Sequence, residues 1–390
     1  MISGFYKKSI QERRNLLENT NISQADITTL AGLIDQETER LDRMSENIIG
    51  SLRLPLGILT GIIVNHQEHI VAMSTEEPSV VAAANRAARL INACGGIFVD
   101  VDNPVTTAQI MFVIQPDSIN ILLQNIISDK QIWIDLANSC DPMLISHHGG
   151  AFNLDIKSLP ADDWNETFLV INLHVYTSDA MGANIVNTMA EKLQTEMIQK
   201  YSHLGILDTG MAILTNRSEG RLATAKVRLP FDSLSKHIQQ DPIEFAKGIV
   251  RSSVFAQRSP ERAVTHNKGI LNGIIAASLP LGQDTRALSA AAYDFACRSG
   301  QHKPLCTWAM DNDCIVGNLR MPMVVGFVGG SRRHPAFECA YRLAQINSYQ
   351  TLCSVLTAIG LSQNLAAIWA LSTEGIQAGH MKLHNRKHAP

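Results

Sequence analysis

The order of predicted elements between residues 107 and 218 constrains the fold of this chain more than any other feature. Apolar, β-branched runs alternate there with long segments of helical pattern. The predicted strands cover 107–115, 151–157, 167–177 and 210–216, and the predicted helical segments cover 118–139 and 182–201. Strand, helix, strand, strand, helix, strand is the split βαβ order of ferredoxin-like domains. The sequence therefore predicts a small α+β domain over 107–218.

Helix-rich sequence flanks this segment on both sides. Amphipathic helices are predicted over 10–45, and another from about Pro78 to Ala93, where proline suits the first turn and alanines favour the interior. We therefore expect an α+β fold in which the small domain is inserted into a larger, helix-rich one. The expected boundaries are 1–106 and 219–375 for the two parts of the large domain, 107–218 for the small domain, and 376–390 for a C-terminal segment.

Composition excludes several classes of protein. Of the 390 residues 45% are apolar and 18% are charged, which is enough apolar material for a core. The net charge of -3 gives no basic excess for nucleic acid or an anionic membrane. The seven cysteines are scattered, and we find no signal peptide and no membrane span, so we expect a cytoplasmic protein.

Several common nucleotide-binding and catalytic motifs are absent. The sequence contains no G-x-G-x-x-G, no P-loop, no H-E-x-x-H and no G-x-S-x-G. A nucleotide, if bound, is therefore held without a Rossmann fingerprint.

Four ionisable residues have unusual neighbours: Glu77 in MSTEEPSVV, Lys268 in THNKGILNG, Asp284 in GQDTRA and His380 in GHM. Each also has a plain structural explanation. Glu77 can complement a helix dipole, Lys268 can be a turn lysine, and Asp284 can cap a helix. His380 is followed by two more histidines at helical spacing, which suits either a metal site or a solvated terminal helix. These alternatives stay open on pattern alone.

A set of longer segments resembles a known family when read in order. They are ENIIGSLRLPLGI, VAMSTEEPSVVAAANRAARL, DAMGANIVNTMAE, RAVTHNKGILNGI, GQDTRA, LRMPMVVGFVGG and STEGIQAGHMKLH. Together they resemble 3-hydroxy-3-methylglutaryl-CoA reductase of the soluble bacterial type, class II, from about residue 10 to the end. The resemblance implies a large CoA-binding domain with an inserted ferredoxin-like nicotinamide-binding domain.

The resemblance also assigns catalytic roles. It implies that Lys268 stabilises the oxyanion in a dry cleft, and that Asp284 holds Lys268 charged and oriented. Glu77 would be the proton donor, most useful at the aldehyde step. His380 would protonate the departing CoA thiolate. The implied reaction interconverts hydroxymethylglutaryl-CoA with mevalonate and CoA in two hydride transfers, without a metal.

Further positions carry implied binding roles. Ser79 and Arg262 would hold the hydroxymethylglutaryl group, and Asn272 would orient substrate within the same loop as Lys268. The residues implied to face the cofactor are Asp141, Asp179, Met181, Gly182 and Asn184.

The cofactor preference follows from Asp141, because a carboxylate at the adenosine ribose repels a 2′-phosphate. We therefore expect NADH to be preferred, with NADPH possible. His148 departs from the family, in which a third glycine is usual at this position.

The resemblance finally implies a homo-oligomer built from dimers. The family continues beyond the histidine as a mobile flap domain, whereas this sequence ends ten residues after His380. We therefore expect residues 376–390 to be the start of a truncated flap. The rival hypothesis is a catalytically silent CoA-binding or assembly protein of the same fold.

Overall fold

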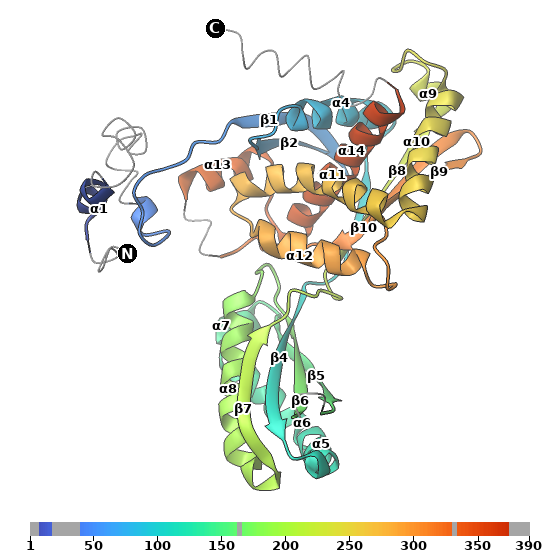
Figure 1. Cartoon of the computed structure of the whole chain (residues 1–390). Helices are drawn as coiled ribbons and strands as arrows, with labels where there is room; N and C mark the ends of the chain where they lie inside the picture. Colours follow the sequence, from blue (N-terminus) through green and yellow to red (C-terminus); the bar gives the residue numbers. More distant parts are fainter. Residues whose placement is uncertain (1–7, 18–39, 162–165, 330–333, 374–390) are drawn as a thin grey trace. The chain divides into compact units, whose positions relative to one another are not determined.

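The computed structural model describes residues 8–17, 40–161, 166–329 and 334–373 (Figure 1). The chain divides into two compact units, 1–55 and 56–390. In the first unit, helix α1 (Ile10–Leu17) starts with a reciprocal cap, since Ser9 N donates to Glu12 Oε2 at 2.7 Å and Glu12 N donates to Ser9 Oγ at 3.3 Å. The helices predicted over 10–45 are confirmed for 10–17, while 18–39 lies outside the described residues.

The larger hydrophobic core of the second unit surrounds helix α14 (Tyr349–Ser372). Against it pack a β-hairpin, several helices and a four-stranded antiparallel sheet of order β3-β8-β10-β9. The hairpin is β1 (Leu56–Val64) and β2 (Gln67–Ser74), and the sheet strands are β3 (Phe98–Val101), β8 (Leu222–Pro230), β9 (Cys306–Asp311) and β10 (Cys314–Pro322). The helices are α4 (Val80–Ala93), α9 (Phe231–Leu234), α10 (Pro242–Arg258), α11 (Pro260–Ser278), α12 (Thr285–Ala296) and α13 (Pro335–Leu343), with a 3₁₀ turn at Leu279–Leu281.

Helix α14 is apolar on all sides because it is a core helix. By length and composition it is long enough to cross a membrane, but 89% of its most apolar window is buried inside the protein. Some of its polar side chains form hydrogen bonds inside the core; Asn364 Oδ1, for example, accepts from Trp308 Nε1 at 2.8 Å. The glycines let its neighbour approach closely. A Cβ on Gly273 of α11 would lie 2.8 Å from Gln363 Cβ, and one on Gly360 would lie 2.7 Å from Ile274 Cδ1.

A second, separate core lies between a four-stranded sheet and its helices. The sheet order is β5-β6-β4-β7, with all pairs antiparallel. The elements are β4 (Val105–Ile114), a 3₁₀ turn (Pro116–Ser118), α5 (Ile119–Ser128), α6 (Lys130–Ser139), α7 (Pro142–Ser146), β5 (Gly150–Leu159), β6 (Thr167–Tyr176), α8 (Ala183–Tyr201), a 3₁₀ turn (Ser202–Leu204) and β7 (Ile206–Leu214). Every predicted element is present in the predicted order, although the segment 118–139 is broken into two helices at Asp129.

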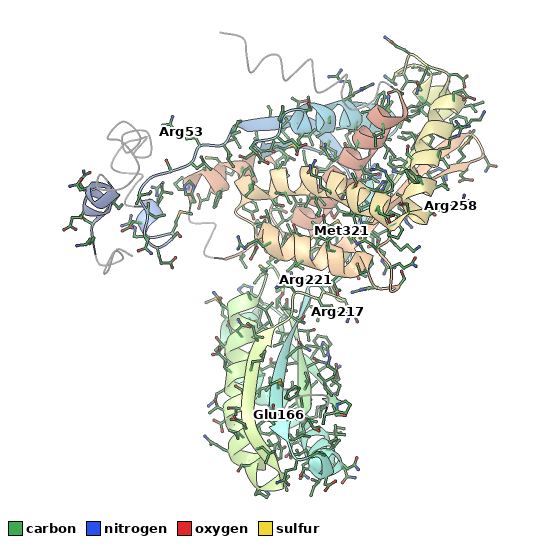
Figure 2. The ribbon with its side chains drawn as sticks, in the orientation of Figure 1. Arg53, Glu166, Arg217, Arg221, Arg258 and Met321 are labelled. Atoms are coloured by element: carbon green, nitrogen blue, oxygen red, sulfur yellow. The ribbon has the colours of Figure 1, made fainter. Side chains whose placement is uncertain are left out.

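Arg221 lies where the chain passes from one core to the other (Figure 2). Its side chain is 1% exposed, and every guanidinium nitrogen donates a hydrogen bond. The acceptors are Thr106 Oγ1 at 3.2 Å, Val325 O at 2.9 Å, Met181 O at 2.9 Å, Ala180 O at 3.0 Å and the hydroxyl of Thr177. Burial lowers the pKa of Arg221. This one side chain therefore ties together segments that are far apart in the sequence.

Candidate active site

Lys268 lies in the middle of helix α11 and not in a turn. The helix starts at Ser259, whose Oγ accepts from Arg262 N at 3.2 Å, with Pro260 in the first turn. Lys268 and Asn272 are four residues apart and so lie on the same side of the helix. The expectation of a shared loop is therefore wrong. The neighbouring Gly269 and Gly273 also lie inside the helix, and Gly273 allows the close approach of Gln363.

The Lys268 ammonium is paired with Glu77, which precedes helix α4. Nζ lies 3.0 Å from Glu77 Oε2 across 191 residues of sequence. The side chains are 54% and 35% exposed, respectively. A dry setting for Lys268 is therefore not present in the described part of this chain, because the buried side of α11 faces α14 and Lys268 lies on its other side.

Asp284 is the N-cap of helix α12. Its Oδ1 accepts from Arg286 N at 2.9 Å and from Ala287 N at 3.1 Å, and its Oδ2 lies 3.1 Å from Arg286 Nη2. The capping alternative raised by the sequence is therefore present. Among the contacts of the described residues, none joins Asp284 to Lys268.

Ser79 occupies the N-cap position of α4 in a backbone conformation that is rare for residues other than glycine. Its φ is 79° and its ψ is -18°, in the left-handed region. Such a conformation costs on the order of 1 kcal/mol and is concentrated at functional sites. Ser79 follows Glu77 by two residues, so this strained turn and the Lys268 partner belong to one short segment.

Arg262 lies near the start of α11, and burial lowers its pKa. Further along the same helix, His266 is 2% exposed and its Nε2 lies 3.1 Å from Cys306 O. Burial first, and then the charge of Arg262, lowers the pKa of His266 to about 4. Arg262 and the buried His266 are four residues apart and so lie on the same side of α11, whereas Lys268 and Asn272 lie on another side.

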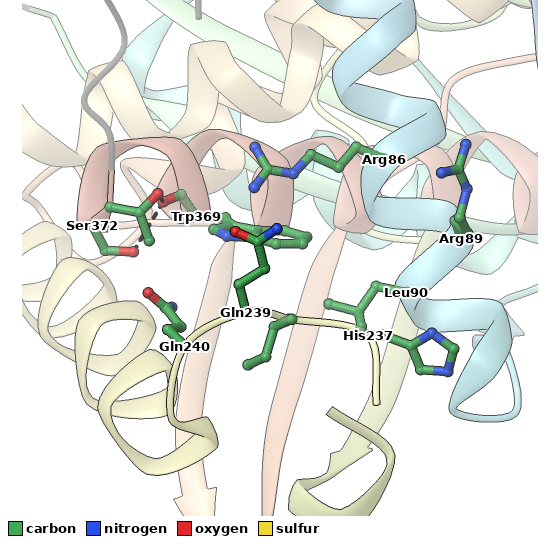
Figure 3. Close-up of a pocket in the computed structure, with 10 residues that line it drawn as sticks. Arg86, Arg89, Leu90, His237, Gln239, Gln240, Trp369 and Ser372 are labelled. Atoms are coloured by element: carbon green, nitrogen blue, oxygen red, sulfur yellow. Dashed lines mark hydrogen bonds between the residues drawn. The ribbon is translucent and has the colours of Figure 1, made fainter. Parts of the chain in front are cut away.

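A pocket of about 800 Å³ opens beside helix α4 (Figure 3). The guanidinium carbon of Arg86 lies 3.9 Å from the centre of the Trp369 ring, and Arg89 follows one helical turn later. The lining residues are Arg86, Arg89, Leu90, His237, Ile238, Gln239, Gln240, Trp369, Ser372 and Thr373. This cationic, aromatic surface suits an anionic ligand. This pocket was not predicted from the sequence. Arg86 and Arg89, three residues apart on the helix after Glu77, could have indicated a cationic surface there.

In the smaller core, Asp141 is the N-cap of α7, and its Oδ1 accepts from Leu144 N at 2.8 Å. His148, where the family usually has glycine, has a φ of 59° at the end of the same helix. Its amide donates to Ile145 O at 3.0 Å and that of Gly149 donates to Leu144 O at 2.9 Å, which is a Schellman motif. Glycine would fit this position without strain. Having His148 in place of glycine therefore changes the side chain there and leaves the turn the same.

The DAMGAN segment connects β6 to α8. Asp179 Oδ1 accepts from Tyr349 N at 2.7 Å, so this carboxylate helps to cap α14. The Met181 side chain packs against a small cluster that includes Ala287 of α12. Gly182 has a φ of 89°, and α8 begins there without a side-chain cap, with Asn184 exposed in its first turn. The amides at this helix start are therefore available to an anion.

The same family emerges from comparison with known proteins. The sequence model of hydroxymethylglutaryl-coenzyme A reductase matches residues 9–385. The enzyme of that name from Archaeoglobus fulgidus is 36% identical over 99% of this chain and 86% of its own length. A solved class II 3-hydroxy-3-methylglutaryl-CoA reductase from Streptococcus pneumoniae, described as bound to NADPH in open conformations, is 35% identical with a TM-score of 0.80, covering 95% of this chain and 99% of that one.

The chain belongs to this family. A probable reductase of the same name from Borreliella burgdorferi is also 32% identical over 98% of this chain and 85% of its own length. The resemblance identified in the sequence is thus confirmed, together with a mixed helix and sheet fold of the class II type. His380, which the family resemblance assigns to catalysis, lies outside the described residues, as do the two histidines after it.

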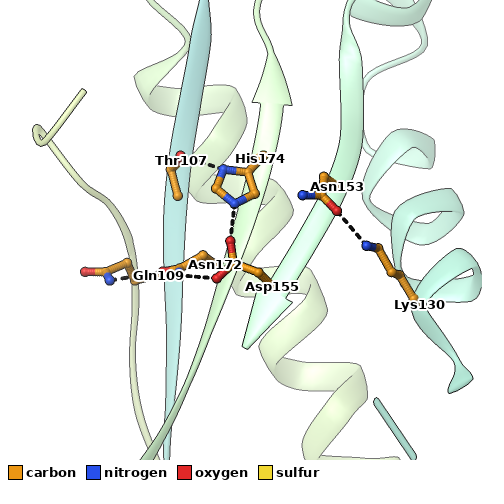
Figure 4. A network of polar contacts seen from close by, with 7 residues as sticks. All are labelled: Thr107, Gln109, Lys130, Asn153, Asp155, Asn172 and His174. Carbon is orange, nitrogen blue, oxygen red and sulfur yellow. Dashed lines mark hydrogen bonds and ion pairs between the residues drawn. The ribbon is translucent and has the colours of Figure 1, made fainter. Parts of the chain in front are cut away.

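A polar stripe on the smaller sheet was missed by the sequence analysis (Figure 4). His174 Nδ1 lies 2.9 Å from Thr107 Oγ1, and its Nε2 contacts Asp155. Asn172 Nδ2 donates to Asp155 Oδ1 at 2.7 Å, and Gln109 continues the stripe. Burial by itself raises the pKa of Asp155, but hydrogen bonds from His174 and Asn172 outweigh it and hold that pKa below its ordinary value. Polar residues at alternate positions of two predicted strands were the available signal.

Proposed function

We propose that this chain interconverts 3-hydroxy-3-methylglutaryl-CoA with mevalonate and CoA. The observation that carries the proposal is the Lys268–Glu77 pair at 3.0 Å in a chain of the reductase family. A cation and a carboxyl group within one contact of each other suit a carbonyl reduction, which needs both charge stabilisation and a proton. Bound nicotinamide cofactors would supply the two hydrides in turn.

Lys268 would stabilise the negative charge that develops on the carbonyl oxygen. An ammonium has three donors, and the pair with Glu77 uses one of them. Asn272, one helical turn further, would donate to the same oxygen or hold the substrate. Glu77 would deliver the proton at the aldehyde step. His380 would protonate the CoA thiolate and so prevent its return to the aldehyde.

The exposure of Lys268 in this chain supports a site completed between two subunits. A charge 54% open to water stabilises an oxyanion weakly, so substrate or a second copy has to exclude water. We therefore infer a homo-oligomer built from dimers. In a dimer Asp284 would also be able to act on Lys268 across the interface. Sedimentation at assay concentration tests this, and a fully active monomer would contradict it.

The pocket beside α4 would hold the phosphates of CoA. Arg86 and Arg89 follow the first residue of α4 by six and nine positions, which is about 9–14 Å along the helix. CoA carries its phosphates far from its thioester, so a cationic pocket at this remove from Glu77 fits the molecule. Arg86 stacked on Trp369 offers both a charge and a flat surface.

The segment 107–218 would be a ferredoxin-like nicotinamide-binding domain inserted between 1–106 and 219–375. The open helix start at Gly182 suits the pyrophosphate. Asp141 uses Oδ1 as a cap, and its Oδ2 would accept from the ribose hydroxyls. No arginine lies between Asp141 and Asp179, so a 2′-phosphate would have to be held there by His147, His148 or Lys157. We therefore propose a preference for NADH, in a cytoplasmic enzyme.

The deciding experiment follows nicotinamide absorbance with hydroxymethylglutaryl-CoA, using NADH and NADPH side by side. We expect both to be consumed, NADH more efficiently, with mevalonate as product. Binding of CoA without consumption of either cofactor would instead support a catalytically silent CoA-binding protein.

A further inference from the structure

The outer face of the sheet β3-β8-β10-β9 is open, whereas its inner face packs against the larger core. Along the middle of β8 and β10, buried residues alternate with outward-facing ones. The strand register places Phe98 beside Lys226, Lys226 beside Asn318, and Asn318 beside Thr307 on the outer face. This row crosses all four strands and is roughly 15 Å long, at about 4.8 Å per strand spacing.

Two neighbouring hollows lie on this outer face. The first has a volume of about 660 Å³ and is lined by residues of β3, β8 and β10, including Lys226. The second has a volume of about 460 Å³, and its lining includes Arg298 and Lys303. Asn318 and Arg320 of β10 line both hollows, so the two form one continuous surface.

This surface is cationic in a chain whose net charge is -3. Its lining contains four cationic side chains and one carboxylate, that of Asp100. Within the described part of the chain, Lys226 and Arg320 form no ion pair, whereas Arg228 on the same face is paired with Asp311 at 2.9 Å. Two cations without a carboxylate partner favour the binding of an anion with more than one charge.

An exposed aromatic ring lies at one end of the surface. Phe98 is 51% exposed, and the backbone of the next residue is held on both sides, since Asn65 Oδ1 accepts from Val99 N at 2.8 Å and Asn65 Nδ2 donates to Val99 O at 2.9 Å. Asn65 and His66 form the two-residue turn between β1 and β2, with φ values of 48° and 69°. Glycine is preferred at the second position of such a turn, but here it is His66, whose ring lies edge-on to Phe98 with centres 5.0 Å apart. Phe98 is therefore a fixed ring with an open surface.

We propose that this surface binds a nucleoside triphosphate, apart from the pocket beside α4 and from the smaller sheet. The base would stack on Phe98, and the phosphates would lie over Lys226 and Arg320, with the outer phosphate towards Lys303. Phe98 lies two strand spacings from the strand of Arg320, which is roughly 10 Å. An extended triphosphate spans such a distance from its base to its outer phosphates. Stacking does not select the base, so the site recognises the phosphates and a flat ring.

The aromatic content of the surface favours a single nucleotide over a nucleic acid strand. Of the two phenylalanines in its lining, Phe98 is exposed, whereas the ring of Phe295 lies 4.4 Å from the guanidinium carbon of Arg298. One open ring provides for one base, and single strands are held by stacking successive bases on several rings. An acidic peptide would use the cations and leave Phe98 without a role.

The first experiment locates the nucleotide without any variant. The full chain is photolysed with 8-azido-ATP at saturating CoA and NADH, and the labelled peptides are identified by mass. We expect the label in peptides that contain β3, β8 or β10, and unlabelled ATP should prevent it. Because a label at the pocket beside α4 or on the smaller sheet falls in other peptides, the result is separate from the proposed reductase activity.

The second experiment measures ATP affinity by calorimetry under the same conditions. Lys226→Gln combined with Arg320→Gln should weaken ATP binding about tenfold or more, because two charged donors are lost. Lys247→Gln combined with Arg342→Gln removes an exposed lysine and arginine elsewhere, both paired with glutamates, and should leave ATP affinity unchanged. Phe98→Ser should weaken ATP binding but not the binding of inorganic triphosphate. Circular dichroism and the melting temperature check that the variants are folded.

Several results would overturn the proposal. One is a label confined to peptides outside β3, β8 and β10, and another is a folded Lys226→Gln, Arg320→Gln variant that binds ATP as the wild type does. Displacement of ATP by a single-stranded RNA or an acidic peptide at lower concentration would identify a macromolecule as the occupant instead. Dissociation of an oligomer in the same double variant, seen by sedimentation, would make this face an interface between copies of the chain.

Discussion

Two cationic side chains lie in opposite surroundings, Lys268 on the outer side of α11 and Arg221 where the two cores meet. Lys268 is 54% exposed and has one carboxylate partner, Glu77. Arg221 is 1% exposed and has no carboxylate partner among the described residues, but all three of its nitrogens donate to carbonyl or hydroxyl oxygens.

The comparison distinguishes a candidate catalytic cation, Lys268, from a structural one, Arg221. Each guanidinium nitrogen of Arg221 already donates within the protein and the residue is 1% exposed, so it is poorly placed to bind a ligand. Lys268 keeps N–H groups that can donate hydrogen bonds to a substrate oxygen. A buried cation surrounded by hydrogen bonds is therefore structural here, whereas the candidate catalytic cation is the less buried one.

The largest expected effect is on stability, from Arg221→Met. The substitution leaves buried oxygens without their donor, and we expect a loss of about 3–5 kcal/mol in the free energy of unfolding. Urea denaturation measures it. Arg217→Met is the control, since Arg217 is 58% exposed and its ion pairs lie at 3.6 Å; it should change stability by about 0.5 kcal/mol or less. Equal losses in both variants would mean that Arg221 has no special role.

Lys268→Ala should act on turnover and not on folding. We expect kcat to fall about 10²–10³-fold, with the melting temperature and CoA affinity almost unchanged, because the ammonium acts on a developing oxyanion. Steady-state kinetics and calorimetry measure these quantities. Lys247→Ala removes another exposed, paired lysine, on α10, and should leave kcat unaltered. A loss of less than tenfold in Lys268→Ala would exclude the oxyanion role.

The buried side of α11 can be tested by the pH dependence of stability, because it carries His266. Its pKa is lowered to about 4 in the folded chain, whereas the unfolded chain takes up the proton near 6.5. The contribution of His266 to the free energy of unfolding is therefore complete above about pH 6.5. It declines as the pH falls to about 4, by about 3 kcal/mol in all. Chemical denaturation across this range measures the decline. His266→Gln should make the profile flatter, and His147→Gln, at an exposed position, should not.

The smallest expected effect is a change of cofactor preference in Asp141→Asn. Asparagine keeps the cap on α7 but removes the negative charge. We expect the ratio of kcat/KM for NADPH to that for NADH to rise about tenfold, which is about 1.4 kcal/mol. Asp135→Asn, an exposed carboxylate on the preceding helix, is the control. A wild-type preference for NADPH would show that Asp141 does not select the cofactor.

The local features of this protein could be predicted from its sequence because they depend on neighbouring residues. The period-two and helical patterns predicted the four strands and the helical segments 118–139 and 182–201, but not the short helix α7 or the break at Asp129. The capping alternative for Asp284 is present, because a cap joins groups two or three residues apart. Lys268 was the exception: it was expected to share a loop with Asn272, but both lie inside α11, as does Gly273, which Gln363 approaches.

The sequence by itself determined the family, the order of elements and the chemical nature of the candidate groups. Only the tertiary structure decided which groups meet. Lys268 and Glu77 are 191 residues apart, Arg86 and Trp369 come from different helices, and nothing in the sequence around Arg221 distinguishes it from an exposed arginine such as Arg217. The physical reason is that local patterns encode which face of each element is buried, whereas contacts between distant side chains depend on how whole elements pack.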